Sequence, residues 1–171
     1  MLEHVIAQYT KVLDRLWVVL PPNDDWGQSV CRHHPVTVVE SPLAHHGMGH
    51  SLATGVQAIL DADTEQSLKG LIIGLADMPG INAEHVAQVL AALQASIGQL
   101  GSQALVVATH QGQDGHPRGM GRDHLVKLTQ LSGDAGARSL LDWSRAERVE
   151  LMGAAPLQDI DRPEDLQALL V

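Results

Sequence analysis

The chain has 171 residues, typical of one domain, and 44% of them are hydrophobic, enough for one sizeable core. Its formal charge of −9 excludes the basic face of most nucleic-acid-binding proteins but leaves a nucleotide ligand open, because local cations and metals can offset it. Cys31 is the single cysteine, which excludes an intramolecular disulfide and fits a reducing compartment. No apolar run reaches the ~20 residues that span a bilayer, and the charged stretch 1–15 does not resemble a signal peptide. We therefore expect a cytoplasmic protein without membrane partners.

Hydrophobic spacing predicts a helix over 2–15, and apolar runs that end at prolines predict strands over 16–20 and 36–39. The stretch 24–34 between them is ambiguous and could form a short helix. The remaining predicted elements are a helix over 51–61, a strand over 70–76, a helix over 83–97 capped by Asn82, a strand over 104–108, helices over 123–130 and 135–142, a strand over 148–152 and a helix over 162–170.

Strands that alternate with helices predict an α/β three-layer fold with a mostly parallel sheet. Ligands bind such sheets at the edge where the loops that follow the strands meet. In this chain those loops are 40–50, 77–82, 109–122 and 153–161.

The apolar run 71–76 ends abruptly at Asp77, which is followed by Met78 and Pro79. A run this short and apolar predicts a strand buried on both faces. A carboxylate at its end could hold a divalent cation that carries phosphates, or it could open the turn that Pro79 continues. Spacing alone leaves both interpretations open.

Residues 109–122 contain four glycines, two histidines and two basic residues, and we predict a long loop there. Glycines let the backbone approach a ligand closely, and long ordered loops in compact domains are usually functional. The alternative is a mobile surface segment. The loop matches neither the phosphate-binding pattern Gly-x-x-x-x-Gly-Lys nor the dinucleotide fingerprint.

Three further charged residues are candidates for capping or binding roles. Asp161 could be a second metal ligand opposite Asp77, or a helix N-cap with Glu164 as its capping-box partner. Asp134 could cap a helix, and Arg138 could contact a phosphate or pair with an acid. Although there are ten histidines, no Cys/His spacing favours zinc, and no Gly-x-Ser-x-Gly elbow favours a serine hydrolase.

Four segments in the same order resemble the molybdenum-cofactor nucleotidyltransferases, a branch of the MobA-like NTP transferases, and most closely the molybdenum cofactor cytidylyltransferases. They are residues 47–55, 75–79, 115–117 with 133–138, and 159–166. The resemblance covers essentially the whole chain and implies a Rossmann-like nucleotidyltransferase fold. It also implies transfer of CMP or GMP from CTP or GTP to molybdopterin, with Mg²⁺ and release of pyrophosphate.

By position, the resemblance makes Asp77 the catalytic, metal-binding aspartate and Asp161 a second acid near the metal. Ser51 resembles the start of the helix on the nucleotide side, and Arg138 lies in a segment that carries the match. Gly115, His116 and Pro117 resemble part of the pterin-side pocket. One small departure is Arg162, where the family more often has threonine.

The larger departure is at the front, because residues 1–6 already resemble the helix that follows the family's first strand and its Gly-rich triphosphate loop. Loss of a central strand would unpair backbone groups on both neighbours, and each buried group costs about 1–3 kcal/mol. We therefore expect that the sheet closes differently, that a partner supplies the strand, or that the sequence starts inside a longer gene product. If Met1 is the true start we expect little turnover, whereas a longer product would be active.

Other functions remain open beside nucleotidyl transfer. The chain could be a non-catalytic module that holds molybdopterin or delivers it to a molybdoenzyme. A sugar-nucleotide transferase shares the fold, although the stretch 133–138 speaks against it. An unpaired sheet position would favour a homodimer by strand pairing. The choice between CTP and GTP depends on the absent segment.

Overall fold

The structure, a computed structural model, describes residues 1–160. Its helices are α1 (Leu2–Tyr9), α2 (Asp25–Cys31), α3 (Met48–Ala62), α4 (Ala83–Leu100) and α5 (Leu125–Leu128). Its strands are β1 (Trp17–Leu20), β2 (Thr37–Glu40), β3 (Gly70–Ile73), β4 (Leu105–His110), β5 (Gln113–Gly121) and β6 (Glu147–Glu150).

The strands form two sheets. In the smaller one β1 pairs with β2 in parallel, and Trp17 lies opposite Thr37. The larger sheet has the order β3-β5-β4-β6. In it β5 runs antiparallel to both neighbours, and β6 runs parallel to β4. The predicted α/β class is confirmed, and the pairing is mixed because β5 reverses direction.

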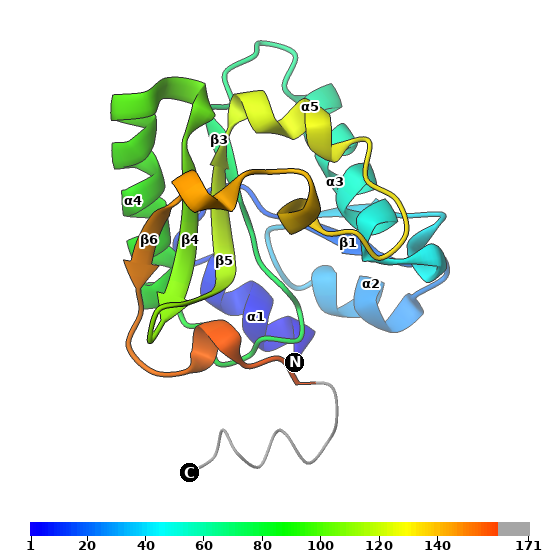
Figure 1. The fold of residues 1–171 in the computed structure, drawn as a ribbon. Helices are drawn as coiled ribbons and strands as arrows, with labels where there is room; N and C mark the ends of the chain where they lie inside the picture. Colours follow the sequence, from blue (N-terminus) through cyan, green and yellow to red (C-terminus); the bar gives the residue numbers. More distant parts are fainter. Residues whose placement is uncertain (161–171) are drawn as a thin grey trace.

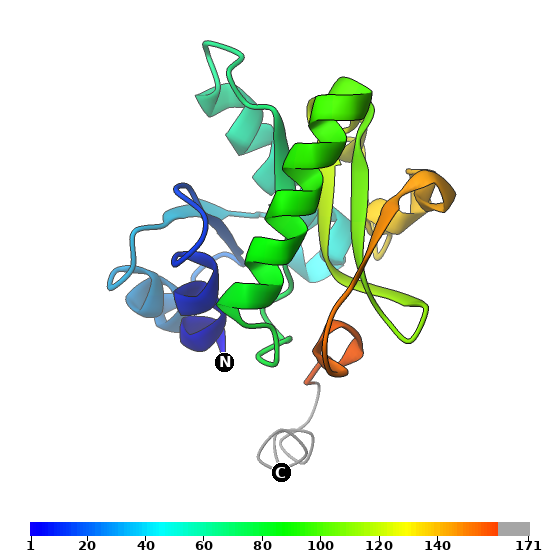
Figure 2. The ribbon, with the colours of Figure 1, turned by 90° about the vertical axis from the view of Figure 1, so that its left-hand side faces the viewer.

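Helices cover both faces of the larger sheet (Figure 1). On one face α4 packs its buried Val89 and Leu93 against Val106, and Figure 2 shows this helix in front of the sheet. On the other face α3 and α5 contribute Val56, Leu125 and Leu128 to a cluster with the β4 and β5 residues Leu105, Val107 and Met120. These two clusters form the main core.

The smaller sheet has its own apolar cluster. Val18 and Leu20 of β1 pack against Ile6 of α1 and Cys31 of α2. Helix α1 ends at Tyr9, so the predicted helix over 2–15 is too long, although Val12 and Leu13 still pack against a neighbouring cluster. The ambiguous stretch 24–34 does form a short helix, α2, and Asp24 caps it by accepting from the Gly27 amide at 2.9 Å.

The predicted loop over 109–122 is wrong, because most of it is β5. Gln111 and Gly112 make a two-residue turn with φ of 51° and 76°, between the paired residues His110 and Gln113. Positive φ at both turn residues suits the twist of a tight hairpin. The glycines of β5 serve close packing, since a Cβ on Gly119 would lie 3.1 Å from Leu93 Cδ2. Polar composition therefore concealed a strand.

Two other predictions also differ from the structure. Residues 135–142 form only a single 3-10 turn at Ala137–Ser139 rather than a helix. Strand β3 ends at Ile73, and its four residues are half-buried rather than buried on both faces, because they line a cavity. Asn82 caps α4 as predicted, with a capping box that His85 completes. The predicted helix over 162–170 and Asp161 lie outside the described residues.

Within residues 1–160, no helix combines the length and the apolar character needed to cross a membrane.

Candidate functional site

A cavity of about 1160 Å³ lies between β1 and β3, and both strands line it along their whole length. In the described part of the chain β1 pairs only with β2, and β3 only with β5. The sheet that the resemblance predicts as continuous is therefore divided in two, with the cavity between its parts. Within the described residues the two parts do not pair with each other across this space.

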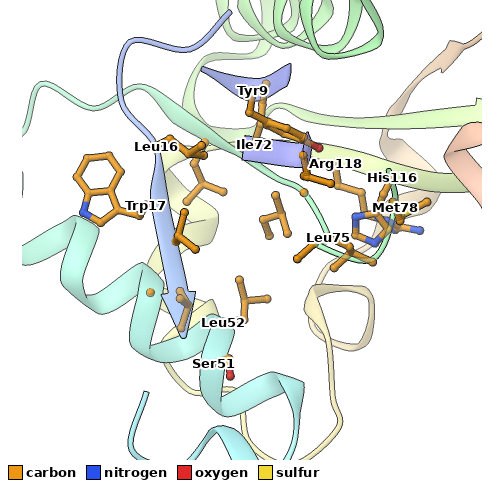
Figure 3. Close-up of a pocket in the computed structure, with 18 of the residues that line it drawn as sticks. Tyr9, Leu16, Trp17, Ser51, Leu52, Ile72, Leu75, Met78, His116 and Arg118 are labelled. Atoms are coloured by element: carbon orange, nitrogen blue, oxygen red, sulfur yellow. The ribbon is translucent and has the colours of Figure 1, made fainter. Parts of the chain in front are cut away.

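The cavity walls are mainly aliphatic, with polar groups gathered in a few places. In Figure 3, Leu16 and Trp17 border the space opposite Ile72 and Leu75, and His116 and Arg118 lie near Leu75 and Met78. An apolar hollow with few polar groups is typical of small-molecule sites, which usually measure about 300–1,000 Å³. The geometry therefore fits a ligand with an extended apolar or planar portion.

Asp77 lies in the cavity wall, on the loop that follows β3. Met78 and Ile81 anchor this loop, since both are buried in a cluster that includes Tyr9. The carbonyl of Asp77 accepts a hydrogen bond from the Ile160 amide at 2.8 Å, and its Oδ1 atom is buried. The chain thus presents this carboxylate from a fixed backbone position.

Asp159 is a second carboxylate in the same wall, and sequence reasoning assigned it no role of its own. The Ile160–Asp77 hydrogen bond holds its segment beside the Asp77 loop. The predicted second acid, Asp161, lies outside the described residues. Within residues 1–160, no group of three or more His, Cys, Asp or Glu side chains is placed to hold a metal ion.

The start of α3 reaches the cavity through Ser51, which lies in its wall. The helix start is fixed against the 133–138 segment, because the Gly49 amide donates to the Gly133 carbonyl at 2.8 Å. A Cβ on Gly47, whose φ is +123°, would lie 2.2 Å from the Gly133 carbonyl carbon. Two segments that carry the family resemblance are thus in direct backbone contact.

Gly115 and His116 lie in the cavity wall, as the prediction of a ligand-facing segment requires, although they belong to a strand. Pro117 is fully buried within β5 and is not part of that wall. Burial and the nearby Arg118 lower the pKa of His116 to about 4, against a hydrogen bond to the Ile73 backbone that raises it. His116 is therefore a neutral imidazole at pH 7.

Arg118 is a cavity residue that the sequence reasoning missed. It is 5% exposed, its Nε donates to the Gly115 carbonyl at 3.0 Å, and its guanidinium carbon lies 4.7 Å from the centre of the Trp143 ring. The available sequence signal was a charged residue directly after the His-Pro pair. Arg138, which was predicted, is exposed at the surface and also lines the cavity.

A family model described as the MobA-like NTP transferase domain matches residues 1–149. No curated protein matches the chain.

Several solved structures share the fold. A homologue of Mycobacterium tuberculosis Rv0371c, from Mycobacterium sp. strain JC1, is 24% identical with a TM-score of 0.68, over 99% of this chain and 80% of that one. Rv0371c of M. tuberculosis H37Rv in complex with manganese is 20% identical with a TM-score of 0.67, over 97% and 82%. A CMP:2-keto-3-deoxy-manno-octonic acid synthetase complexed with CTP is 12% identical with a TM-score of 0.69, over 98% and 85%. This likeness confirms the predicted α/β nucleotidyltransferase fold.

Proposed function

Because the chain belongs to the MobA-like NTP transferase family, we propose that it transfers CMP from CTP to the phosphate of molybdopterin, with GTP as the alternative donor. One observation carries the proposal: four separate segments bring Ser51, Asp77, His116 and Arg138 to the wall of a single cavity. Sequence resemblance assigns these segments to the nucleotide, the metal and the pterin. The cavity is large enough to hold parts of both substrates.

The residues present fit a divalent cation. Mg²⁺ usually takes one or two carboxylates and completes its shell with water and substrate phosphates. Asp77 and Asp159 both line the cavity, and the buried Oδ1 of Asp77 lies in a fixed loop. When bound, the ion would neutralise charge on the triphosphate during displacement. The manganese complex of Rv0371c and the CTP complex of the synthetase support this metal and nucleotide chemistry.

The transfer itself needs positioning and charge neutralisation more than covalent help from the protein. A phosphate oxygen of molybdopterin attacks the α-phosphorus of CTP, the bond to the bridging oxygen breaks, and pyrophosphate leaves with the electron pair. Arg138 offers a cation at the cavity wall for the phosphates. His116, which is neutral, can take part in hydrogen bonds to a pterin without adding charge.

The test is pyrophosphate release by the chain with CTP, molybdopterin and Mg²⁺, with GTP as a second donor. Any release should require molybdopterin, stop when EDTA removes the metal, and fall about a hundredfold or more in Asp77→Asn. The matched control is Asp61→Asn, which changes an exposed α3 carboxylate that accepts a hydrogen bond from Gln57. Release that persists in Asp77→Asn, or that needs no molybdopterin, would contradict the proposal.

A second candidate is a non-catalytic module that holds molybdopterin or delivers it to a molybdoenzyme, and one observation favours it. In the described part of the chain, the space between β1 and β3 contains no strand or Gly-rich loop that could hold a triphosphate. Tight molybdopterin binding that is independent of CTP, without pyrophosphate release, would favour this module over the enzyme.

A further inference from the structure

Arg118 is a buried cation that its neighbours hold in one position. The side chain is 5% exposed, and its Nε donates to the Gly115 carbonyl at 3.0 Å. The guanidinium carbon lies 4.7 Å from the centre of the Trp143 ring, and the indole is fixed by donating to the Ala137 carbonyl at 3.3 Å. Ring and backbone together orient the guanidinium beside the cavity.

The guanidinium has hydrogen-bonding capacity that residues 1–160 leave unused. Its Nη1 atom is buried and has no hydrogen-bond partner among them. Arginine keeps its charge in proteins, and buried charges are normally paired with an opposite charge. The charge of Asp114 stabilises that of Arg118, but Arg148 already engages this acid, with Nε at 3.1 Å from one carboxylate oxygen and Nη2 at 3.4 Å from the other.

A second guanidinium adds to the positive charge at this place. Burial lowers the pKa of Arg118, Asp114 raises it, and the nearby Arg138 lowers it again. Arg118 therefore lies near a second cation, Arg138, while the Asp114 carboxylate that stabilises its charge is engaged by Arg148. This local surplus of positive charge occurs in a chain whose formal charge is −9. Both Arg118 and Arg138 line the cavity, so the surplus is offered to a ligand.

We propose that Arg118, together with Arg138, binds a phosphate group of a ligand in this cavity. A planar guanidinium donates two parallel hydrogen bonds to phosphate oxygens, and such charge-assisted bonds are roughly twice as strong as neutral ones. The phosphate could belong to the nucleotide or to the acceptor, which share this chemistry. The inference rests on the proposed function only in assigning the ligand, since phosphate binding itself needs no turnover.

A purely structural role for Arg118 makes the opposite prediction about stability. If packing on Trp143 were its purpose, replacement by an apolar side chain would destabilise the fold. If the charge serves a ligand, Arg118→Met removes an uncompensated buried cation while it keeps most of the volume, and stability in phosphate-free buffer should be unchanged or higher.

The experiment measures the thermal unfolding midpoint of the full chain against inorganic phosphate, pyrophosphate and CTP, at constant ionic strength. The indole N–H resonance of Trp143, assigned with Trp143→Phe, reports binding at the site itself. The first variant is Arg118→Met. The second, Arg148→Met, frees Asp114 to pair with Arg118. The control is Arg145→Met, which changes an exposed arginine paired with Asp142.

We expect phosphate to raise the midpoint and shift the Trp143 resonance in the wild type and in Arg145→Met. Arg118→Met should bind phosphate at least about tenfold more weakly, and Arg148→Met should also weaken it. A stronger effect of CTP than of pyrophosphate would point to the nucleotide, and equal effects of pyrophosphate and phosphate to a single phosphate group; either supports the site.

An undiminished phosphate effect in Arg118→Met, or no phosphate effect in the wild type, would overturn the proposal. If Arg118→Met does not fold, an undiminished phosphate effect in Arg148→Met overturns it instead. Failure here leaves the pyrophosphate-release assay unaffected, and failure of that assay leaves phosphate binding measurable, so the two proposals fail separately.

Discussion

The amide of Gly49 donates a hydrogen bond to the carbonyl of Gly133 at 2.8 Å, which joins the start of α3 to the turn before Arg138. The contact fixes two cavity walls that are more than eighty residues apart in the sequence. It requires close backbone approach, because a Cβ on Gly49 would lie 2.6 Å from the Ala135 carbonyl oxygen. Gly49 therefore has a packing reason, whereas Gly133 is favoured by its positive φ of 58°.

Gly47→Ala should destabilise the protein by more than about 1 kcal/mol. Its φ of +123° disfavours a side chain, and the new Cβ would lie 2.2 Å from the Gly133 carbonyl carbon. Urea unfolding measures the loss. The control is Gly98→Ala within α4, where no atom lies within 4 Å of the new Cβ and a small gain is expected. Equal stability of the two variants would contradict the close contact.

The Asp63 carboxylate should stabilise the protein at neutral pH and lose this contribution in acid. Arg122 lowers the pKa of this carboxyl by donating to it, and the amides of Ser67 and Leu68 also donate. A lowered pKa in the folded state gives stability that is present above the unfolded value of about 3.9 and lost as pH falls below it.

Asp63→Asn should therefore be much less stable than the wild type at pH 7, and the difference should shrink as pH falls towards the folded pKa. Urea unfolding across this range measures it, with Asp61→Asn as the exposed control. A difference that stays constant with pH would show that the charge of Asp63 contributes nothing.

His116 should titrate at a pH of about 4, because burial and Arg118 disfavour its charged form. The unfolded chain binds this proton at about 6.5, so stability is complete above that pH and falls by about 3 kcal/mol as pH drops to 4. Ring resonances in NMR measure the pKa, and His116→Gln should lack this part of the pH dependence. A ring that titrates near 6.5 would mean that His116 is solvated.

Asn82→Ala should cost about 1 kcal/mol of stability, because it removes the acceptor for the His85 amide at 3.0 Å and breaks the capping box of α4. Asn82→Asp keeps an acceptor and should retain most of the stability. Denaturant unfolding compares the variants. Equal stability of the alanine and aspartate variants would argue that the cap contributes nothing.

Elements with a clear hydrophobic period or a capping residue could be predicted from the sequence. The Asn82 cap set the start of α4, and the apolar run before His110 set most of β4. The strand β5 could not, because its residues Gln113–Gly121 are polar, glycine or proline except for Met120. Their burial comes from the packing of Leu93 and other distant residues, which a local pattern does not contain.

The cavity residues divide in the same way. Ser51, Asp77, His116 and Arg138 were predicted from motifs, and the structure brings all of them to one wall. Arg118 was missed because its importance depends on Trp143, which is distant in sequence, and on the engagement of Asp114 by Arg148. Such a relationship between side chains that are distant in sequence exists only after folding.

The most direct test of the central claim is binding of the Mn²⁺–CTP complex, followed by the loss of the free Mn²⁺ signal in electron paramagnetic resonance. If the Asp77 loop holds a metal and a nucleotide, the wild type and Asp61→Asn should bind the complex equally, and Asp77→Asn should bind it roughly tenfold more weakly or worse. Binding to Asp77→Asn with wild-type affinity, or no binding to the wild type, would contradict the account.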